Sequence, residues 1–162
     1  LQICALRLPL VYGAEPKANF ARLQKLVLSG VPLPLAGLDN RRSVLALVNL
    51  LAVVQCLLEK KHWPFFALNV ADPEPVSTVE LVRVIAESSR RQARLFYFPG
   101  SWLRCFARIV GLGVFIDKLT GDLDVSVERL RGQLPEAQLI PTASAFQCMQ
   151  NGTLRARKVT VN

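Results

Sequence analysis

The sequence is poor in the residues from which metal centres and disulfide frameworks are built. It contains one histidine in 162 residues, and its cysteines form no C-x-x-C pair. A zinc site and a disulfide-stapled fold are therefore excluded as first interpretations. Since unpaired cysteines are commonly buried, we expect free buried thiols in a reducing cytoplasm. The four cysteines are Cys4, Cys56, Cys105 and Cys148.

Long hydrophobic runs are also missing. The longest uncharged stretch, Ser43 to Leu58, falls short of the roughly 20 residues that span a bilayer. The beginning of the sequence has no basic segment leading into an apolar stretch, which a signal peptide would need. We therefore expect no membrane span and a cytoplasmic location.

The common nucleotide and nucleophile motifs are absent as well. No G-x-G-x-x-G loop occurs, and Gly111-Leu112-Gly113 follows a predicted helix where a phosphate loop would precede one. No nucleophile elbow is found. The sequence thus offers no complete catalytic constellation.

Positive charge is what the sequence has in excess. There are 20 Lys and Arg against 12 Asp and Glu, a formal net charge of +8. This balance favours acidic ligands in general. Nucleic acid is disfavoured, because only two Trp and two Tyr occur and the basic groups are not interleaved with aromatic residues.

Strand-like and helix-like segments alternate along the chain, which predicts an α/β fold. The firmest helix begins at Ser77 and runs to about Ser89, because Ser77 and Glu80 form a capping box. The Pro-rich segment 31–37 favours an extended sheet edge. The other predicted strands are 3–10, 43–48, 65–70 and 93–98; the other predicted helices are 19–29, 49–60, 101–110 and 125–131.

A set of anion-binding parts remains. Asn19 at a helix start can cap the helix or offer its amide to a ligand oxygen. Arg42, in a turn before a buried strand, can bind phosphate with two N–H groups or simply be solvated. The segment 31–37 offers backbone groups between apolar side chains, which suits the edge of a flat base.

The order of several motifs resembles the C-terminal portion of extended short-chain dehydrogenases, the NAD-dependent sugar-nucleotide epimerase/dehydratase family. The resemblance covers roughly residues 3 to 141. Relatives often carry Asn where Leu10 stands, and its absence points away from the best-known galactose epimerases toward a looser branch of the family. The motifs are R-x-P-x-V-Y-G from Arg7, P-L-P-L-x-G from Pro32, N-R-R-S from Asn40, V-N-L from Val48, N-V-A-D from Asn69, V-S-T-V-E-L from Val76 and L-T-G-D-L from Leu119.

The resemblance implies a fold and a set of site residues. The fold would be a substrate-binding portion with a few strands of the second half of a Rossmann-type sheet and flanking helices. NAD would be contacted at its nicotinamide end by Leu8, Pro9 and Leu10, and a nucleoside-diphosphate sugar, UDP-linked, would be bound by other residues. These would be Asn19 and Arg42 at the diphosphate, Leu33 and Leu35 at the base, and Lys118 in place of a late phosphate-binding arginine.

The resemblance also implies what the sequence lacks. The family's Y-x-x-x-K pair does not occur, since Tyr12 is followed by Pro16 and Tyr97 by Ser101. We therefore expect a substrate-binding part of an epimerase or dehydratase, spanning 1–150 with a poorly ordered basic tail at 151–162, that cannot transfer hydride alone. The alternative is a noncatalytic interaction module derived from that fold, which would self-associate or bind a partner through its exposed apolar surface.

Overall fold

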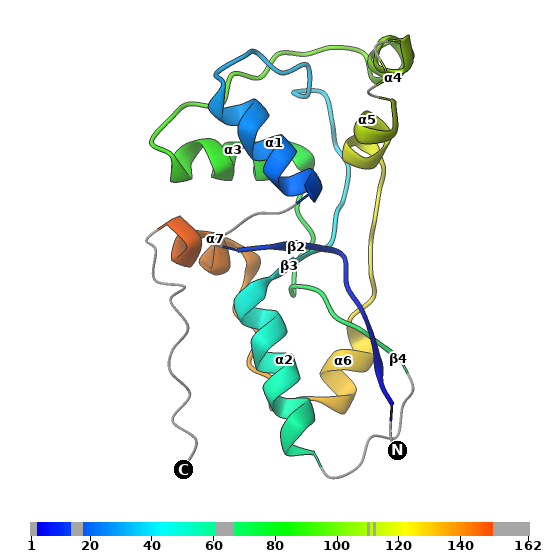
Figure 1. Cartoon of the computed structure of the whole chain (residues 1–162), viewed down its shortest axis with the longest axis vertical. Coiled ribbons are helices and arrows are strands. Elements are labelled where there is room, and N and C mark those ends of the chain that lie inside the picture. Colours follow the sequence, from blue (N-terminus) through cyan, green and yellow to red (C-terminus); the bar gives the residue numbers. More distant parts are fainter. Residues whose placement is uncertain (1–2, 14–17, 61–66, 110, 112, 151–162) are drawn as a thin grey trace. The chain divides into compact units, whose positions relative to one another are not determined.

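Two compact units make up the computed structural model (Figure 1). The structure describes residues 3–13, 18–60, 67–109, 111 and 113–150. Unit 1 consists of Leu1–Glu15, Ser43–Pro75 and Asp124–Asn162, and unit 2 consists of Pro16–Arg42 and Val76–Leu123. Each unit is therefore assembled from segments that lie far apart in the sequence. The predicted basic tail lies outside the described residues.

The described residues of unit 1 form short parallel strands and three helices. Strands β1 and β4 pair in parallel, with Leu6 opposite Leu68, and β2 and β3 pair in parallel, with Val11 opposite Leu45. Parallel pairing of apolar strands joined by helices confirms the predicted α/β class. Its elements are β1 (Ala5–Arg7), β2 (Leu10–Tyr12), β3 (Val44–Ala46), α2 (Leu47–Glu59), β4 (Ala67–Asn69), α6 (Glu128–Gln133) and α7 (Thr142–Gln150).

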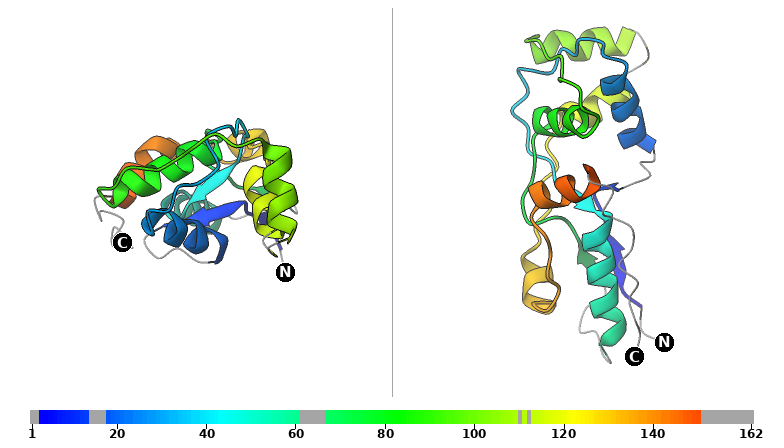
Figure 2. Two further views of the ribbon diagram at one scale, coloured as in Figure 1. Left: turned by 90° about the horizontal axis from the view of Figure 1, so that it is seen from above. Right: turned by 90° about the vertical axis from the view of Figure 1, so that its left-hand side faces the viewer.

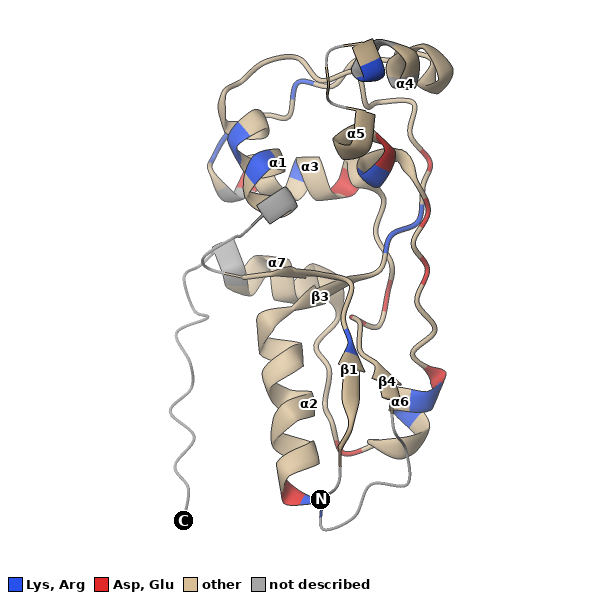
Figure 3. Cartoon of the chain, turned by 45° about the vertical axis from the view of Figure 1, so that its right-hand side comes forward, with Lys and Arg blue, Asp and Glu red and all other residues tan. Residues whose placement is uncertain are grey.

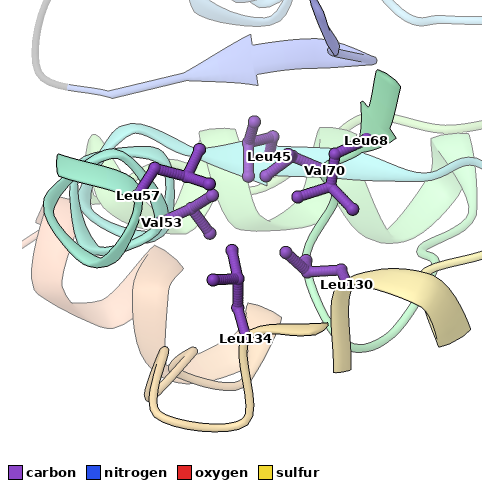
Figure 4. Close-up of a cluster of buried hydrophobic side chains, with 7 residues drawn as sticks. All are labelled: Leu45, Val53, Leu57, Leu68, Val70, Leu130 and Leu134. Atoms are coloured by element: carbon purple, nitrogen blue, oxygen red, sulfur yellow. The ribbon is translucent and has the colours of Figure 1, made fainter. Parts of the chain in front are cut away.

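The core of unit 1 is a cluster of aliphatic side chains from strands and helices (Figure 4). Helix α2 is amphipathic with hardly any charge, so it packs on the cluster along much of its length (Figure 3). Burial of each such side chain contributes about 1.5 to 3 kcal/mol, and together these contacts fix the strands against α2 and α6. The cluster consists of Leu45, Val53, Leu57, Leu68, Val70, Leu130 and Leu134.

A buried carboxylate joins the strand ends of unit 1. Asp72 is 4% exposed and accepts hydrogen bonds from Tyr12 Oη at 2.7 Å, from the Ala46 N–H at 2.9 Å and from Asn49 Nδ2 at 2.7 Å. The Tyr12 ring stacks on Phe146 of α7, with ring centroids 4.4 Å apart. Asn49 in turn exchanges two hydrogen bonds with the backbone of Ile140. Motif residues from V-Y-G, V-N-L and N-V-A-D thus meet at one point.

In the part of unit 2 that the structure describes there are four helices and short paired loop segments. Helices α1 and α3 pack on each other, as do α4 and α5 (Figure 2). The capping box predicted at the start of α3 is present, with the Ser77 N–H bound to Glu80 Oε2 and the Glu80 N–H bound to Ser77 Oγ. Its helices are α1 (Ala18–Leu28), α3 (Thr78–Ser88), α4 (Gly100–Ile109) and α5 (Gly113–Thr120).

The structure corrects several predicted strands. The single strand expected at 3–10 is divided into β1 and β2, which pair with different partners, because Pro9 at the junction has no N–H for a continuous ladder. The strand expected at 93–98 is wrong apart from one bridge between Leu33 and Leu95. That bridge supports the edge predicted for 31–37.

Two helices, the first residue of α2 and the burial of the cysteines also differ from expectation. Helices α5 and α7 were not predicted, because they are only 8 and 9 residues long and neither is preceded by a recognisable capping residue. Asn49, expected to begin and cap α2, lies inside its first turn, and Ala46 occupies the cap position without a side-chain hydrogen bond. All four cysteines are free, as predicted, but none is fully buried and Cys105 is exposed.

The pH dependence of folding tests the Asp72 site. Burial raises the pKa of Asp72, and the hydrogen bonds from Ala46, Tyr12 and Asn49 only partly offset this. The stabilisation that the protonated carboxyl contributes is therefore complete below the ordinary aspartate pKa and is lost as pH rises through the raised folded value.

We expect the free energy of unfolding of the wild type, relative to Asp72→Asn, to fall as the pH rises above about 4, the ordinary pKa of an aspartate. Denaturant unfolding at several pH values measures it. Glu74→Gln, which removes an exposed carboxyl two residues away, is the control. A difference that rises with pH would contradict the prediction.

Candidate functional site

The residues singled out in the sequence fall into two groups. Leu8, Pro9 and Leu10 lie in unit 1, and all the predicted substrate-binding residues lie in unit 2. Each group is therefore considered within its own unit.

The predicted cofactor segment is an apolar corner between two strands. Leu8 is 42% exposed, Pro9 is half-buried, and Leu10 is the first residue of β2, opposite Val44. Gly13 then follows, and a Cβ at this position would lie 3.2 Å from Leu47 Cβ, which explains the glycine of the V-Y-G motif. The sequence holds no glycine-rich loop for the phosphates of NAD.

Unit 2 is organised around a buried carboxamide that was not predicted as a site residue. Asn40 is 5% exposed, and its Oδ1 accepts the Thr78 N–H at 3.1 Å. Its Nδ2 lies 3.1 Å from Thr78 Oγ1, 3.0 Å from Leu119 O and 3.2 Å from Gly121 O. Thr78 Oγ1 also donates to Leu119 O at 2.6 Å. One side chain therefore satisfies a free N–H at the start of α3 and a free carbonyl at the end of α5.

These hydrogen bonds around Asn40, which we call the Asn40 node, bring three motifs together. Arg42 pairs with Val76 in antiparallel and with Leu123 in parallel orientation. The Arg41 N–H donates to Asp122 Oδ1 at 2.8 Å. Residues of N-R-R-S, V-S-T and L-T-G-D-L thus lie side by side although some 80 positions separate Arg41 from Asp122. The N-R-R-S motif contains Asn40, but the sequence does not mark it as a site residue, because asparagine is also common in turns.

Arg42 is the half-buried cation of this node. Its Nη1 donates to Gly121 O at 2.6 Å, and its backbone exchanges two hydrogen bonds with Val76. Burial lowers the pKa of the guanidinium, and Asp122 partly offsets the shift. An arginine remains charged at neutral pH even so. The contact with Gly121 holds the planar group in one place, and this is the only hydrogen bond recorded for the guanidinium among the described residues.

Leu33 and Leu35 are anchors of the Pro-rich segment. Their side chains are 5% and 3% exposed. The Leu33 N–H donates to Arg94 O, and the Leu33 carbonyl accepts the Phe96 N–H. Backbone groups expected to be open to a ligand are therefore partly used within unit 2. The exposed edge of the segment is formed by its other residues and by the ring of Tyr97, which would lie 2.6 Å from a Cβ at Gly37.

The remaining two predicted residues lie at helix ends. Asn19 is in the first turn of α1, and Lys118 is exposed in the last turn of α5, directly before the Leu119 carbonyl that Asn40 binds. A lysine at a helix C-terminus also complements the helix dipole, so its position does not by itself assign a ligand.

The described residues contain no group of three or more His, Cys, Asp or Glu side chains placed to hold a metal ion. Among the helices that the structure describes, none is long and apolar enough to cross a membrane.

Comparison with known proteins supports the family suggested by the motifs. No family model matches the chain. A UDP-glucose 4-epimerase of Vibrio cholerae is 30% identical over 135 residues, which cover 83% of this chain and 41% of that protein. The resemblance to sugar-nucleotide epimerases is thereby confirmed.

Solved structures give the same fold. The UDP-N-acetylglucosamine 4-epimerase from Bacillus cereus matches with a TM-score of 0.65 at 14% identity, over 95% of this chain and 47% of that one. The UDP-glucuronic acid 4-epimerase from Bacillus cereus, solved with UDP-glucuronic acid and NAD, matches with a TM-score of 0.63 at 15% identity, over 93% and 45%. The chain therefore has the fold of part of an epimerase and spans less than half the length of these proteins.

A single amide-to-acid exchange tests the Asn40 node. In Asn40→Asp a carboxylate faces the Leu119 and Gly121 carbonyls and can donate to neither, so we expect the free energy of unfolding to fall by about 3 kcal/mol. Denaturant unfolding measures the change. Gln92→Glu makes the same chemical exchange at an exposed position of unit 2 and should change stability by less than about 0.5 kcal/mol. Equal effects of the two variants would contradict the role of Asn40.

Proposed function

We propose that this chain is the nucleotide-gripping part of an NAD-dependent sugar-nucleotide epimerase or dehydratase, and that its ligand is a UDP-linked sugar. The observation that carries the proposal is the meeting of N-R-R-S, V-S-T and L-T-G-D-L around Arg42. Of these segments, the family resemblance assigns N-R-R-S, through Arg42, to diphosphate binding. The UDP-glucuronic acid bound in one of the solved structures similar to this chain supports the choice of a uridine nucleotide.

In this proposal Arg42 is the phosphate clamp. The group is planar, permanently charged and held by Gly121 O, so little side-chain entropy remains to be lost on binding. Asn19 and Lys118 would add an amide donor and a point charge to the same diphosphate. Burial of the guanidinium strengthens its attraction for an anion by lowering the local dielectric constant.

The base would lie along the exposed edge of the segment 31–37. The buried side chains of Leu33 and Leu35 anchor that segment. The Tyr97 ring, 73% exposed, adds a flat apolar surface beside Gly37. In the complete protein NAD supplies hydride acceptance and return at the sugar, and Leu8, Pro9 and Leu10 would pack against its nicotinamide end. Binding energy from the nucleotide would hold the sugar in a reactive orientation.

A cytoplasmic location is part of the same proposal. Sugar nucleotides and NAD are intracellular metabolites, and four free cysteines suit a reducing compartment. Self-association of the complete protein stays a prediction.

Titration of the complete protein with UDP and with uridine tests the clamp. We expect Arg42→Ala to weaken UDP binding roughly tenfold or more, because a charge-assisted bidentate contact is lost. Uridine binding should not change, because uridine has no phosphate. Arg42→Lys, which keeps the charge but not the planar fork, should give an intermediate affinity for UDP.

The neighbouring Arg41→Ala is the matched control, since Arg41 is exposed. Calorimetry reports both affinities, and circular dichroism confirms that each variant is folded. Unchanged UDP affinity in a folded Arg42→Ala protein would exclude Arg42 as the clamp. An equal loss for uridine and UDP would show that the substitution acts on the base or on the fold.

A further inference from the structure

Helices α4 and α5 carry apolar side chains that point into solvent. Trp102 and Ile109 on α4 are 70% and 78% exposed, and Val114 on α5 is 72% exposed. Trp102, Cys105 and Ile109 recur at helical spacing, so they share one side of α4, whereas Leu103 is the buried side chain. We call the exposed group of Trp102, Cys105, Ile109 and Val114 the α4–α5 surface.

Helix α4 has no acidic residue, whereas α5 carries the exposed Asp117 one helical turn from Val114. Between Glu87 and Asp117 there are five arginines and neither Asp nor Glu. Arg108 on α4 is exposed, and Figure 3 shows α4 with basic and without acidic residues. Six of the chain's twelve aromatic residues also lie in this interval. The arginines are Arg90, Arg91, Arg94, Arg104 and Arg108.

The charge of the whole chain is concentrated in the same unit. Unit 2 has twelve Lys and Arg against five Asp and Glu, and unit 1 has eight against seven. A second copy of the chain thus offers no acidic excess with which to cover the surface, and a two-fold contact would bring the arginines of both copies together. Nucleic acid would satisfy the arginines but not Ile109 and Val114, because aliphatic side chains do not stack on bases.

An anionic lipid bilayer satisfies both features. Basic side chains are attracted to acidic headgroups, tryptophan is stable at the boundary of headgroup and acyl chain, and short aliphatic groups enter the outer hydrocarbon. We propose that the α4–α5 surface binds the protein peripherally to an anionic lipid bilayer. Because α4 is only 10 residues long, binding is reversible. Because the attraction between arginine and acidic headgroups is screened by ions, binding is also sensitive to salt.

Vesicle flotation of the complete protein tests the proposal. Vesicles of phosphatidylcholine with phosphatidylglycerol should carry the protein at low salt, and vesicles of phosphatidylcholine alone should not. High salt should release it. Ile109→Ser should lower the partition coefficient roughly tenfold, because one aliphatic side chain no longer enters the hydrocarbon.

The chain offers a close control. Leu58 on α2 is 77% exposed, almost the same as Ile109, but lies in unit 1. Leu58→Ser should leave the partition unchanged. Arg108→Gln should weaken binding and Arg129→Gln, at an exposed position of α6, should not. Circular dichroism confirms folding of all four variants.

Tryptophan fluorescence gives an independent reading. In the 162-residue chain carrying Trp63→Phe, Trp102 is the only tryptophan left, and its emission should shift to shorter wavelength when phosphatidylglycerol vesicles are added. Failure of the complete protein to float, equal binding to uncharged vesicles, or an equal effect of Leu58→Ser would overturn the proposal. So would a dimer that forms without vesicles and is lost in Ile109→Ser, because the surface would then bind a second copy.

Discussion

The arrangement of unit 2 depends on the hydrogen bonds of one buried carboxamide. Loops 40–42 and 121–123 are too short to form sheets, so their backbone groups need partners from side chains or from each other. Asn40 supplies both a donor and an acceptor, and it bonds the first N–H of α3 and the last-turn carbonyl of α5. No charged side chain could do both. The position of Arg42 follows, because its Nη1 binds Gly121 O, the same oxygen that Asn40 Nδ2 approaches.

In unit 1 a carboxylate provides the corresponding hydrogen bonds to backbone and side-chain groups. Each of its strands has three residues, which gives few ladder hydrogen bonds, and Asp72 adds bonds to β2, β3 and α2 through Tyr12, Ala46 and Asn49. The two solutions differ in cost. Burying the charge of Asp72 opposes ionisation, as the direction of its pKa shift shows, whereas Asn40 is neutral at every pH. Within the described residues, no buried side-chain nitrogen or oxygen is left without a partner.

Local signals determined which parts of this structure could be predicted from sequence. The capping box at Ser77 and the alternation of strands and helices were predictable, because each depends on neighbouring residues. The partners of Asn40 and Asp72 were not, because they lie up to 81 positions away in the sequence. The division of the first strand at Pro9 and the partial exposure of the cysteines depend on packing in the same way. Arg42 was identified from its motif, but its contact with Gly121 was not.

The fixed position of Arg42 also bears on why lysine and arginine are used differently in unit 2. Lys118 is exposed at the end of α5 and can move, so it offers long-range attraction for an anion more than a defined geometry. Arg42 is half-buried and tethered, so it offers geometry. Arg108 is of neither kind, since it is exposed on α4 next to the exposed Ile109. Cations in unit 2 thus differ by environment. The tethered Arg42 suits a small, structured anion such as a diphosphate. The exposed Arg108, on the same helix as Trp102 and Ile109, suits an extended anionic surface.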